Sequence, residues 1–372
     1  MKQRNNWTIL IIITSSFLFV RCNVYSSSAL SISHSSLKTF MFNATNAYNF
    51  IQKQVDLGPR YPGSIGIENV RQLIALKLLP TEKWEIKYQN FSKKWNNQDV
   101  TLVNIICSPG PINLTQPAFL LIAHYDTRLW ADHDPNLAKR KDPVLGANDG
   151  ASGVAVVLEL GRVLFEEYHY TNFRLIFFDG EDQGDIWGWD WLLGSRFYVD
   201  SQEFRSQNLS FAILFDMVAG INATFKREKN SDQYAGRLVT KIWNKADALG
   251  FSKFFVNQTG YRIIDDHLPF IEHNIPAIDI IDDFSHRFKP WHTTFDNMTF
   301  IDTKTIEAVG LTLESVLIQL LTSEGWISNL STITYQTTFS VFNLLNITIL
   351  LAVVNTRRKK KLTPWKNLRS NI

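Results

Sequence analysis

Apolar runs alternate with amphipathic segments through most of the chain. Short runs rich in β-branched and aromatic residues predict strands, and longer segments with apolar residues at helical spacing predict helices. The predicted strands cover residues 84–91, 101–107, 118–123, 173–178, 211–216 and 277–281. The predicted helices cover residues 42–56, 68–79, 152–167, 232–249 and 302–321. This alternation predicts an α/β fold, a three-layer sandwich whose central mixed, mostly parallel sheet is covered by helices on both faces.

The N-terminus has the pattern of a secretory signal. A positively charged start precedes an apolar stretch over residues 7–20, and Ser-rich sequence follows. This pattern predicts a signal peptide or N-terminal anchor over residues 1–22 and a linker over 23–40. An uncleaved anchor is the alternative because Arg21 stands where a small residue favours cleavage. The same Arg21 makes the position before Cys22 unlike a lipoprotein signal.

A second apolar segment, residues 333–354, contains no charged residue and is long enough to cross a bilayer, which takes roughly 20 residues. A buried amphipathic helix is the alternative. The basic run at 357–361 favours a transmembrane helix with a cytoplasmic tail over 355–372. Residues 41–325 then form an extracellular or luminal domain in a type I membrane protein.

The composition between these ends agrees with an exported, glycosylated domain. Sequons for N-glycosylation begin at Asn43, Asn90, Asn113, Asn208, Asn222, Asn257, Asn297 and Asn329. The two cysteines, Cys22 and Cys107, cannot form a disulfide framework, and Cys107 lies in an apolar run that predicts a buried small hydrophobe. The net charge is +3, and no basic patch is interleaved with aromatics in the domain, so nucleic acid is not the expected partner.

Polar residues that can bind a metal follow several of the predicted strands or precede a predicted helix. They are His124, Asp149, Asp179, Glu181, Asp182, Asp216 and His292. Each has a simpler interpretation alone: Asp149 could cap a helix, His124 could be a core histidine, and Asp216 could begin a turn. Together they meet at the carboxyl edge of one sheet, where ligands of such sheets bind.

Oxygen and nitrogen ligands without a nearby thiolate fit a catalytic Zn²⁺ site with an open position. The adjacent carboxylates Glu181 and Asp182 repel each other unless a cation or a proton intervenes. With Asp182 as a ligand, Glu181 is free to move a proton, as a metal hydrolase or acyl transferase requires.

The motifs HYDTR, GANDGASG, FFDGED, LGSR, FDMVAG, DDHLPF and WHTTFD occur in this order over roughly residues 40–325. In combination they resemble the zinc aminopeptidase-like family that includes the glutaminyl-peptide cyclotransferases. The resemblance implies that Asp149, Asp182 and His292 hold one zinc ion and that Glu181 is the general acid and base. Asp182 stands where many members have Glu, which changes the geometry slightly.

In the two-metal peptidases of this family, the residues that match His124 and Asp216 bind a second zinc ion, and Asp149 bridges the two. The resemblance therefore implies one zinc ion, or two. It also implies that Asp126 orients His124 from behind.

Two branches of the family remain open: cyclases, which convert an N-terminal glutaminyl residue to pyroglutamyl and release ammonia, and peptidases, which use a zinc-activated water to remove N-terminal residues. Trp187 and Trp291 resemble the aromatic pocket of the cyclases, and Asp265 resembles the group that hydrogen-bonds Asp216 in their proton relay. An aromatic pocket excludes water. Intramolecular attack needs this exclusion, whereas hydrolysis does not. GANDGASG is closer to the peptidases.

We favour a cyclase acting on peptide or protein N-termini over an aminopeptidase. In this interpretation Trp187 is the pocket wall, and Trp189 and Trp191 are packing residues. A third hypothesis is a receptor-like ectodomain without activity, which membrane anchoring and glycosylation would suit. The complete set of ligands together with Glu181 argues against it.

Overall fold

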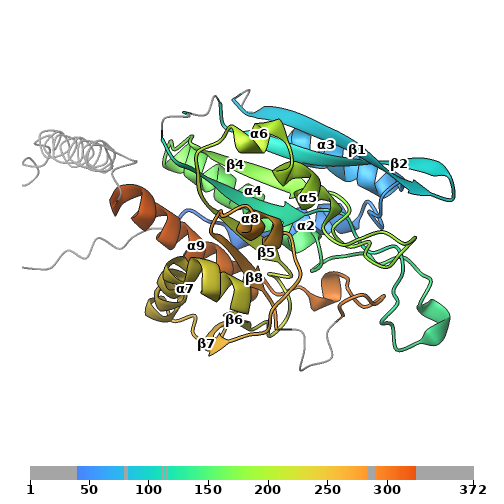
Figure 1. Ribbon diagram of the computed structural model, residues 1–372. Helices are drawn as coiled ribbons and strands as arrows, with labels where there is room; N and C mark the ends of the chain where they lie inside the picture. The colour runs from blue at the N-terminus through green and yellow to red at the C-terminus, as the bar shows by residue number, and fades with distance from the viewer. Residues whose placement is uncertain (1–39, 79–82, 111–112, 114–115, 284–289, 324–372) are drawn as a thin grey trace, which may run out of the picture. The chain divides into compact units, whose positions relative to one another are not determined.

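A six-stranded mixed sheet forms the centre of the molecule (Figure 1). The computed structural model describes residues 40–78, 83–110, 113, 116–283 and 290–323. The sheet has the order β1-β2-β4-β3-β5-β8. Its strands are β1 (Glu85–Trp95), β2 (Gln98–Ser108), β3 (Ala118–His124), β4 (Phe173–Phe178), β5 (Leu209–Asp216) and β8 (Ala277–Ile281). The β1–β2 and β2–β4 pairs are antiparallel, whereas β4, β3, β5 and β8 run parallel, as the sequence predicts.

Two groups of helices cover the two faces of this sheet. One group consists of α2 (Ala44–Val55), α3 (Ile65–Leu78), α4 (Ala151–Arg162), α7 (Lys229–Ala248) and α9 (Thr303–Ser323). The other consists of α5 (Leu193–Val199), α6 (Gln202–Arg205) and α8 (Leu268–Glu272). The three-layer α/β architecture is therefore confirmed.

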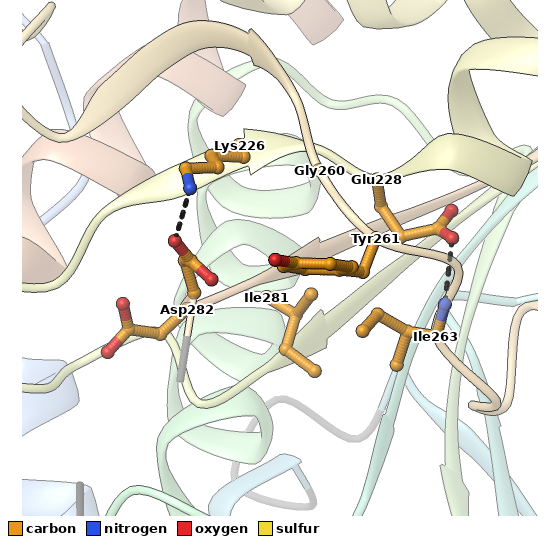
Figure 2. A pocket seen from close by; sticks show the side chains of 8 residues that line it. Lys226, Glu228, Gly260, Tyr261, Ile263, Ile281 and Asp282 are labelled. Atoms are coloured by element: carbon orange, nitrogen blue, oxygen red, sulfur yellow. Dashed lines mark hydrogen bonds and ion pairs between the residues drawn. The ribbon is translucent and has the colours of Figure 1, made fainter. Parts of the chain in front are cut away.

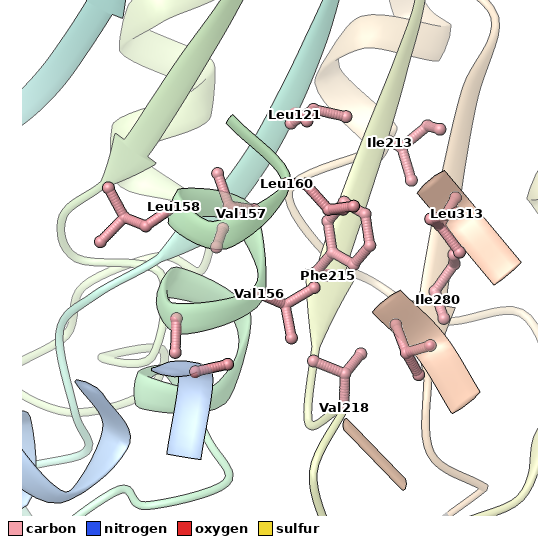
Figure 3. Packing of buried hydrophobic residues seen from close by; sticks show 14 of the residues in the cluster. Leu121, Val156, Val157, Leu158, Leu160, Ile213, Phe215, Val218, Ile280 and Leu313 are labelled. Carbon is pink, nitrogen blue, oxygen red and sulfur yellow. The ribbon is translucent and has the colours of Figure 1, made fainter. Parts of the chain in front are cut away.

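Alternation along the strands divides the core between the two faces. Leu121 of β3 and Ile213 and Phe215 of β5 point toward α4 and α9 in the larger cluster (Figure 3). Their neighbours Leu120 and Leu214 belong to the smaller cluster with the short helices. Because both faces are buried, the parallel strands are mostly apolar up to the polar residues at their ends, with Arg174 in β4 and Asp279 in β8 as charged exceptions.

Helix α4 approaches β5 closely enough to require glycine at one position. A Cβ atom on Gly153 would lie 2.0 Å from the carbonyl oxygen of Phe215. This contact brings the start of α4, just after Asp149, against the end of β5, where Asp216 lies.

Several elements were not predicted from the sequence. The short helices α5, α6 and α8 are absent from the prediction, as is the two-stranded sheet of β6 (Phe225–Arg227) and β7 (Phe255–Thr259). The predicted helix 152–167 ends as an α-helix at Arg162 and continues as a π-helical turn over Val163–Glu167. Short 3₁₀ turns lie at Leu137–Lys139 and Met298–Phe300.

Within the described residues, α9 alone is long and apolar enough to cross a membrane, and 78% of its apolar window is buried. It packs against α2, α4 and α7, as a core helix does. The signal segment 1–22, most of the linker 23–40, the apolar segment 333–354 and the tail 355–372 lie outside the described residues.

Candidate metal centre and active site

Two groups of buried carboxylates and histidines lie at the carboxyl edge of the parallel strands. One contains Asp149, Asp182 and His292, and the other contains His124, Asp149 and Asp216. In each group the potential ligand atoms lie within 4.8 Å of one another. Oδ1 of Asp149 is 3.1 Å from Nε2 of His124, and its Oδ2 is 3.9 Å from Nε2 of His292. Asp149 thus lies between the two groups.

The turn before α4 presents Asp149 to both groups. Gly150 has φ of +93°, and a Cβ atom there would lie 2.7 Å from the carbonyl oxygen of Asp126. The buried carboxylate of Asp296 accepts hydrogen bonds from the backbone N–H groups of Asn148 and Asp149 at 2.8 and 3.0 Å. The side chain of Asp149 does not cap α4, so it remains available as a ligand.

The turn after β4 is held by Asp126. Its Oδ1 accepts from the backbone N–H of Glu181 at 3.1 Å, and its Oδ2 accepts from the N–H of Asp182 at 3.2 Å and from Nε2 of Gln183 at 3.1 Å. Oδ1 of Asp126 is also 3.6 Å from Nδ1 of His124. Asp126 therefore contacts the predicted His124 and also fixes the adjacent acidic pair, a role that the sequence did not suggest.

His292 lies in the left-handed region with φ of +54°, which is uncommon for a residue other than glycine. Its Nε2 is 2.8 Å from Oδ1 of Asp182, and its Nδ1 is 3.6 Å from Oδ1 of Asp132. Arg128 holds Asp132 with two hydrogen bonds, at 2.9 and 2.6 Å, and donates to the carbonyl oxygen of Asp182 at 3.0 Å. Asp132, His133 and His292 form a further candidate metal group, which is partly exposed.

Two tryptophans pack against His292. Trp291 stacks on the imidazole with a centroid separation of 3.8 Å, and Trp191 lies 6.0 Å away with its ring tilted by only 7°. The guanidinium carbon of Arg128 lies 4.9 Å from the centre of the Trp191 ring. Trp191, predicted to be a packing residue, thus lies beside the site.

Trp187 has a different environment. Its ring stacks on Trp95 at 4.4 Å and meets Trp189 edge to face at 4.8 Å, in a small cluster with Leu102 and Leu193. These contacts tie the turn after β4 to the tip of the β1–β2 hairpin. That Trp187 forms a pocket wall stays a prediction.

Glu181 is 7% exposed and lies beside the ligand groups. Burial raises its pKa well above the ordinary value, and the negative charges of Asp265 and Asp266 raise it further, although the nearby His124 opposes them. A carboxyl group with a raised pKa is suited to accept and return a proton near neutral pH.

The residues of the first group fit a metal ion. Burial, and then the charge of Asp149, raise the pKa of Asp182, so an ionised pair needs a cation nearby. Burial and the charge of Arg128 lower the pKa of His292, which favours the neutral imidazole that a metal binds. Oδ2 of Asp149 and Oδ2 of Asp182 are buried and have no hydrogen-bond partner among the described residues, and Nε2 of His292 forms no hydrogen bond there although it lies 2.8 Å from Oδ1 of Asp182.

The hydrogen bond expected between Asp265 and Asp216 stays a prediction. Oδ1 of Asp265 accepts from the backbone N–H of Asp266 at 2.6 Å, and its Oδ2 has no hydrogen-bond partner in the described part of the chain. Oδ1 of Asp216 lies 3.2 Å from Nε2 of His124. The two carboxylates still interact, because burial and then the charge of Asp216 raise the pKa of Asp265.

A parallel sheet with buried carboxylates, histidines and a proton-exchanging carboxyl group at the ends of its strands defines an α/β enzyme with a candidate metal centre. The chain belongs to peptidase family M28, whose family model matches residues 104–317.

Relatives of two kinds resemble this chain. Glutaminyl-peptide cyclotransferase of Gloydius blomhoffii is 27% identical over 72% of this chain and 80% of its own length. Aminopeptidase YwaD of Bacillus subtilis is 30% identical over 59% of this chain and 44% of its own length. The glutaminyl cyclase of Porphyromonas gingivalis superposes with a TM-score of 0.71 and 35% identity, covering 76% of this chain and all of that one. A Zn-dependent exopeptidase from Parabacteroides distasonis superposes with a TM-score of 0.69 and 35% identity, covering 74% of this chain and 97% of that one.

The hydrogen bonds of Asp126 lead to a first prediction. In Asp126→Asn an amide NH₂ replaces one carboxylate oxygen and faces N–H donors, so the turn bearing Asp182 shifts. We expect zinc affinity to fall about 10- to 100-fold, the usual effect of removing a group that orients ligands. Competition with a chromogenic chelator measures the zinc affinity of both proteins.

Glu159→Gln is the matched control, because Glu159 is a buried carboxylate that accepts from Asn43 and pairs with Arg162 away from this edge of the sheet. Zinc affinity in this variant should equal that of the wild type. Equal affinities in both variants would contradict the role of Asp126.

Proposed function

We propose that this protein is a zinc-dependent glutaminyl-peptide cyclotransferase that acts on peptide or protein N-termini. The stacking of Trp291 and Trp191 against His292 carries the proposal, since these rings would supply the apolar walls with which a cyclase keeps water from a small uncharged side chain. The cyclotransferases and glutaminyl cyclases among the relatives support it.

Asp149, Asp182 and His292 would hold the zinc ion. The bound ion supplies Lewis-acid polarisation of the substrate's γ-carbonyl oxygen. The α-amine nitrogen attacks the γ-carbonyl carbon and forms the lactam C–N bond, and the bond to the γ-amide nitrogen breaks. Glu181 takes the proton from the attacking amine and gives it to the leaving nitrogen, which departs as ammonia. Its raised pKa suits both transfers.

A zinc aminopeptidase is the second candidate. The group of His124, Asp149 and Asp216 favours it, because a second metal could bind there. Glu181 would then take a proton from the attacking water and give it to the leaving amine nitrogen, and the scissile peptide bond would break to release the N-terminal residue. The exopeptidase and aminopeptidase relatives support this candidate.

Both candidates predict the same effect of Glu181→Gln. The amide cannot exchange the proton, so turnover should fall by at least about 100-fold, the lower end of the contribution of general acid–base catalysis. Zinc content, measured by atomic emission, should be unchanged because Glu181 is not a ligand. Asp185→Asn, an exposed carboxylate in the same turn, should keep full activity. An active Glu181→Gln variant would refute the mechanism.

Two peptides distinguish the candidates. The domain is incubated with a Gln-initiated and a Leu-initiated peptide of otherwise identical sequence, and the products are read by mass spectrometry. We expect ammonia to be lost from the first and the second to stay intact. Release of leucine instead would identify the aminopeptidase. An N-acetylated Gln peptide is the control, because it lacks the free amine that attacks.

The organisation of the whole chain is part of the same proposal. Residues 1–22 would direct export or form an N-terminal anchor, 23–40 would link it to the catalytic domain 41–325, and 333–354 would anchor the protein in the membrane before the cytoplasmic tail 355–372. The exposure of six sequon asparagines supports an exported domain; they are Asn43, Asn90, Asn113, Asn208, Asn222 and Asn257.

Expression in a secretory cell tests this organisation. The full chain should sediment with membranes, whereas a chain ending after residue 332 should appear in the medium. Peptide N-glycosidase should increase the electrophoretic mobility of both. Sedimentation of the shortened chain with membranes would identify residues 1–22 as an uncleaved anchor. Appearance of the full chain in the medium would remove the C-terminal anchor from the proposal, and unchanged mobility would remove the glycosylation.

A further inference from the structure

Glu228 is a buried carboxylate at the start of α7, where it caps the helix. Its Oε1 accepts from the backbone N–H of Asn230 at 2.9 Å, and its Oε2 accepts from the N–H of Ser231 at 2.6 Å. The side chain of Ser231 donates to Oε2 as well, at 2.7 Å. These contacts satisfy free backbone N–H groups at the start of the helix, and they can be explained by helix capping alone.

The same carboxylate also holds the loop that leads into α8. Oε1 accepts from the backbone N–H of Ile263 at 3.1 Å, and Oε2 lies 3.3 Å from Nε2 of His267. Ile263 and His267 flank Asp265 on its two sides. Figure 2 shows the carboxylate turned toward Ile263 at the edge of a cavity of about 100 Å³.

His267 is fully buried and continues the chain of contacts to the sheet. Its Nδ1 lies 3.8 Å from Oδ2 of Asp279 on β8, and the backbone N–H of Asp279 donates to Oγ of Ser231 at 3.0 Å.

Burial alone would raise the pKa of Glu228, but its interaction with His267 and the N–H groups of Asn230 and Ser231 outweigh burial and lower that pKa to about 2. The carboxylate is therefore ionised at neutral pH. The carboxyl group of Asp265, by contrast, accepts from the backbone N–H of Asp266 through Oδ1 and has no hydrogen-bond partner at Oδ2 among the described residues, so the position of the loop backbone determines where it lies.

We propose that Glu228 is a positioning residue, which places Asp265 at the active site by holding Ile263 and His267 on either side of it. This inference rests on the proposed function for its effect on turnover. Glu228 touches neither the candidate ligands nor Glu181 in the contacts described, and it acts through the backbone of the loop. A displacement of about 1 Å at a reacting group can lower a rate about 100-fold.

Two variants separate positioning from helix capping. Glu228→Asp keeps an excellent N-cap residue but shortens the arm that reaches Ile263 and His267. His267→Gln leaves the cap intact and releases the other end of the loop. In each we expect kcat for the Gln-initiated peptide to fall about 10- to 100-fold, with KM changed less than about threefold. In the double variant kcat should be no lower than in the more impaired single variant, because both substitutions break the same connection between Glu228 and the loop.

Glu314→Gln is the matched control. Glu314 is another buried carboxylate with long-range contacts, and it accepts from the backbone N–H groups of Met41 and Phe42 at the start of the domain. Its loss should lower the unfolding temperature and leave kcat unchanged. Wild-type kcat in Glu228→Asp or in His267→Gln would overturn the proposal, as would an equal loss of kcat in Glu314→Gln.

Hydrogen exchange measured by mass spectrometry gives a readout that does not depend on turnover. Peptides covering residues 261–268 should exchange faster in both loop variants and at the wild-type rate in Glu314→Gln. If the wild-type enzyme acts on neither peptide, the proposed function fails while this measurement still decides the role of Glu228. An unchanged hydrogen-exchange rate of these peptides in Glu228→Asp and His267→Gln would overturn the positioning role of Glu228.

Discussion

The crowding of buried carboxylates at one edge of the sheet is the constraint on which the rest of the structure depends. A buried, unpaired carboxylate is costly, and this edge gathers many of them. Backbone N–H groups offset part of the cost: Asp126 and Asp296 each accept from two N–H groups of a turn that carries a candidate ligand. The turns are therefore fixed by the same contacts that make the buried charges tolerable.

Buried guanidinium groups offset a further part of the free-energy cost of burying these carboxylates. Arg60 donates to the carbonyl oxygens of the turn before Asp149, and Arg71 pairs with Asp179 at 2.7 Å under the turn after β4. Arg128 lies on the outer side and holds Asp132. Among the described ion pairs, Arg128 alone of the three reaches an inner carboxylate, at 3.7 Å from Asp182. Ionisation of both Asp149 and Asp182 therefore needs a further cation, which a metal ion can supply.

The sequence predicts most of the sheet and the ligand groups, because both leave local signals. Continuous apolar runs mark strands buried on both faces, and a polar residue directly after such a run marks the active edge. Trp191 and Glu228 left no such signal. Trp191 is one of several tryptophans in a short segment, and Glu228 stands in a charged stretch that would suit an exposed helix start. Only the tertiary structure brings the first to His292 and the second to His267. The short helices were missed because a turn or two of helix shows no periodicity.

The position of β8 at the end of the sheet has a consequence for how the enzyme matures. Its pairing with β5 joins segments more than sixty residues apart, and such non-local parallel pairing forms slowly. His292 follows this last strand, so a growing chain carries the crowded carboxylates before it has synthesised the histidine that completes their first group. A nascent chain that stops short of this point leaves the β5 edge open and its acidic cluster unbalanced. A metal site built from this group would therefore be complete only when nearly all of the domain has been made.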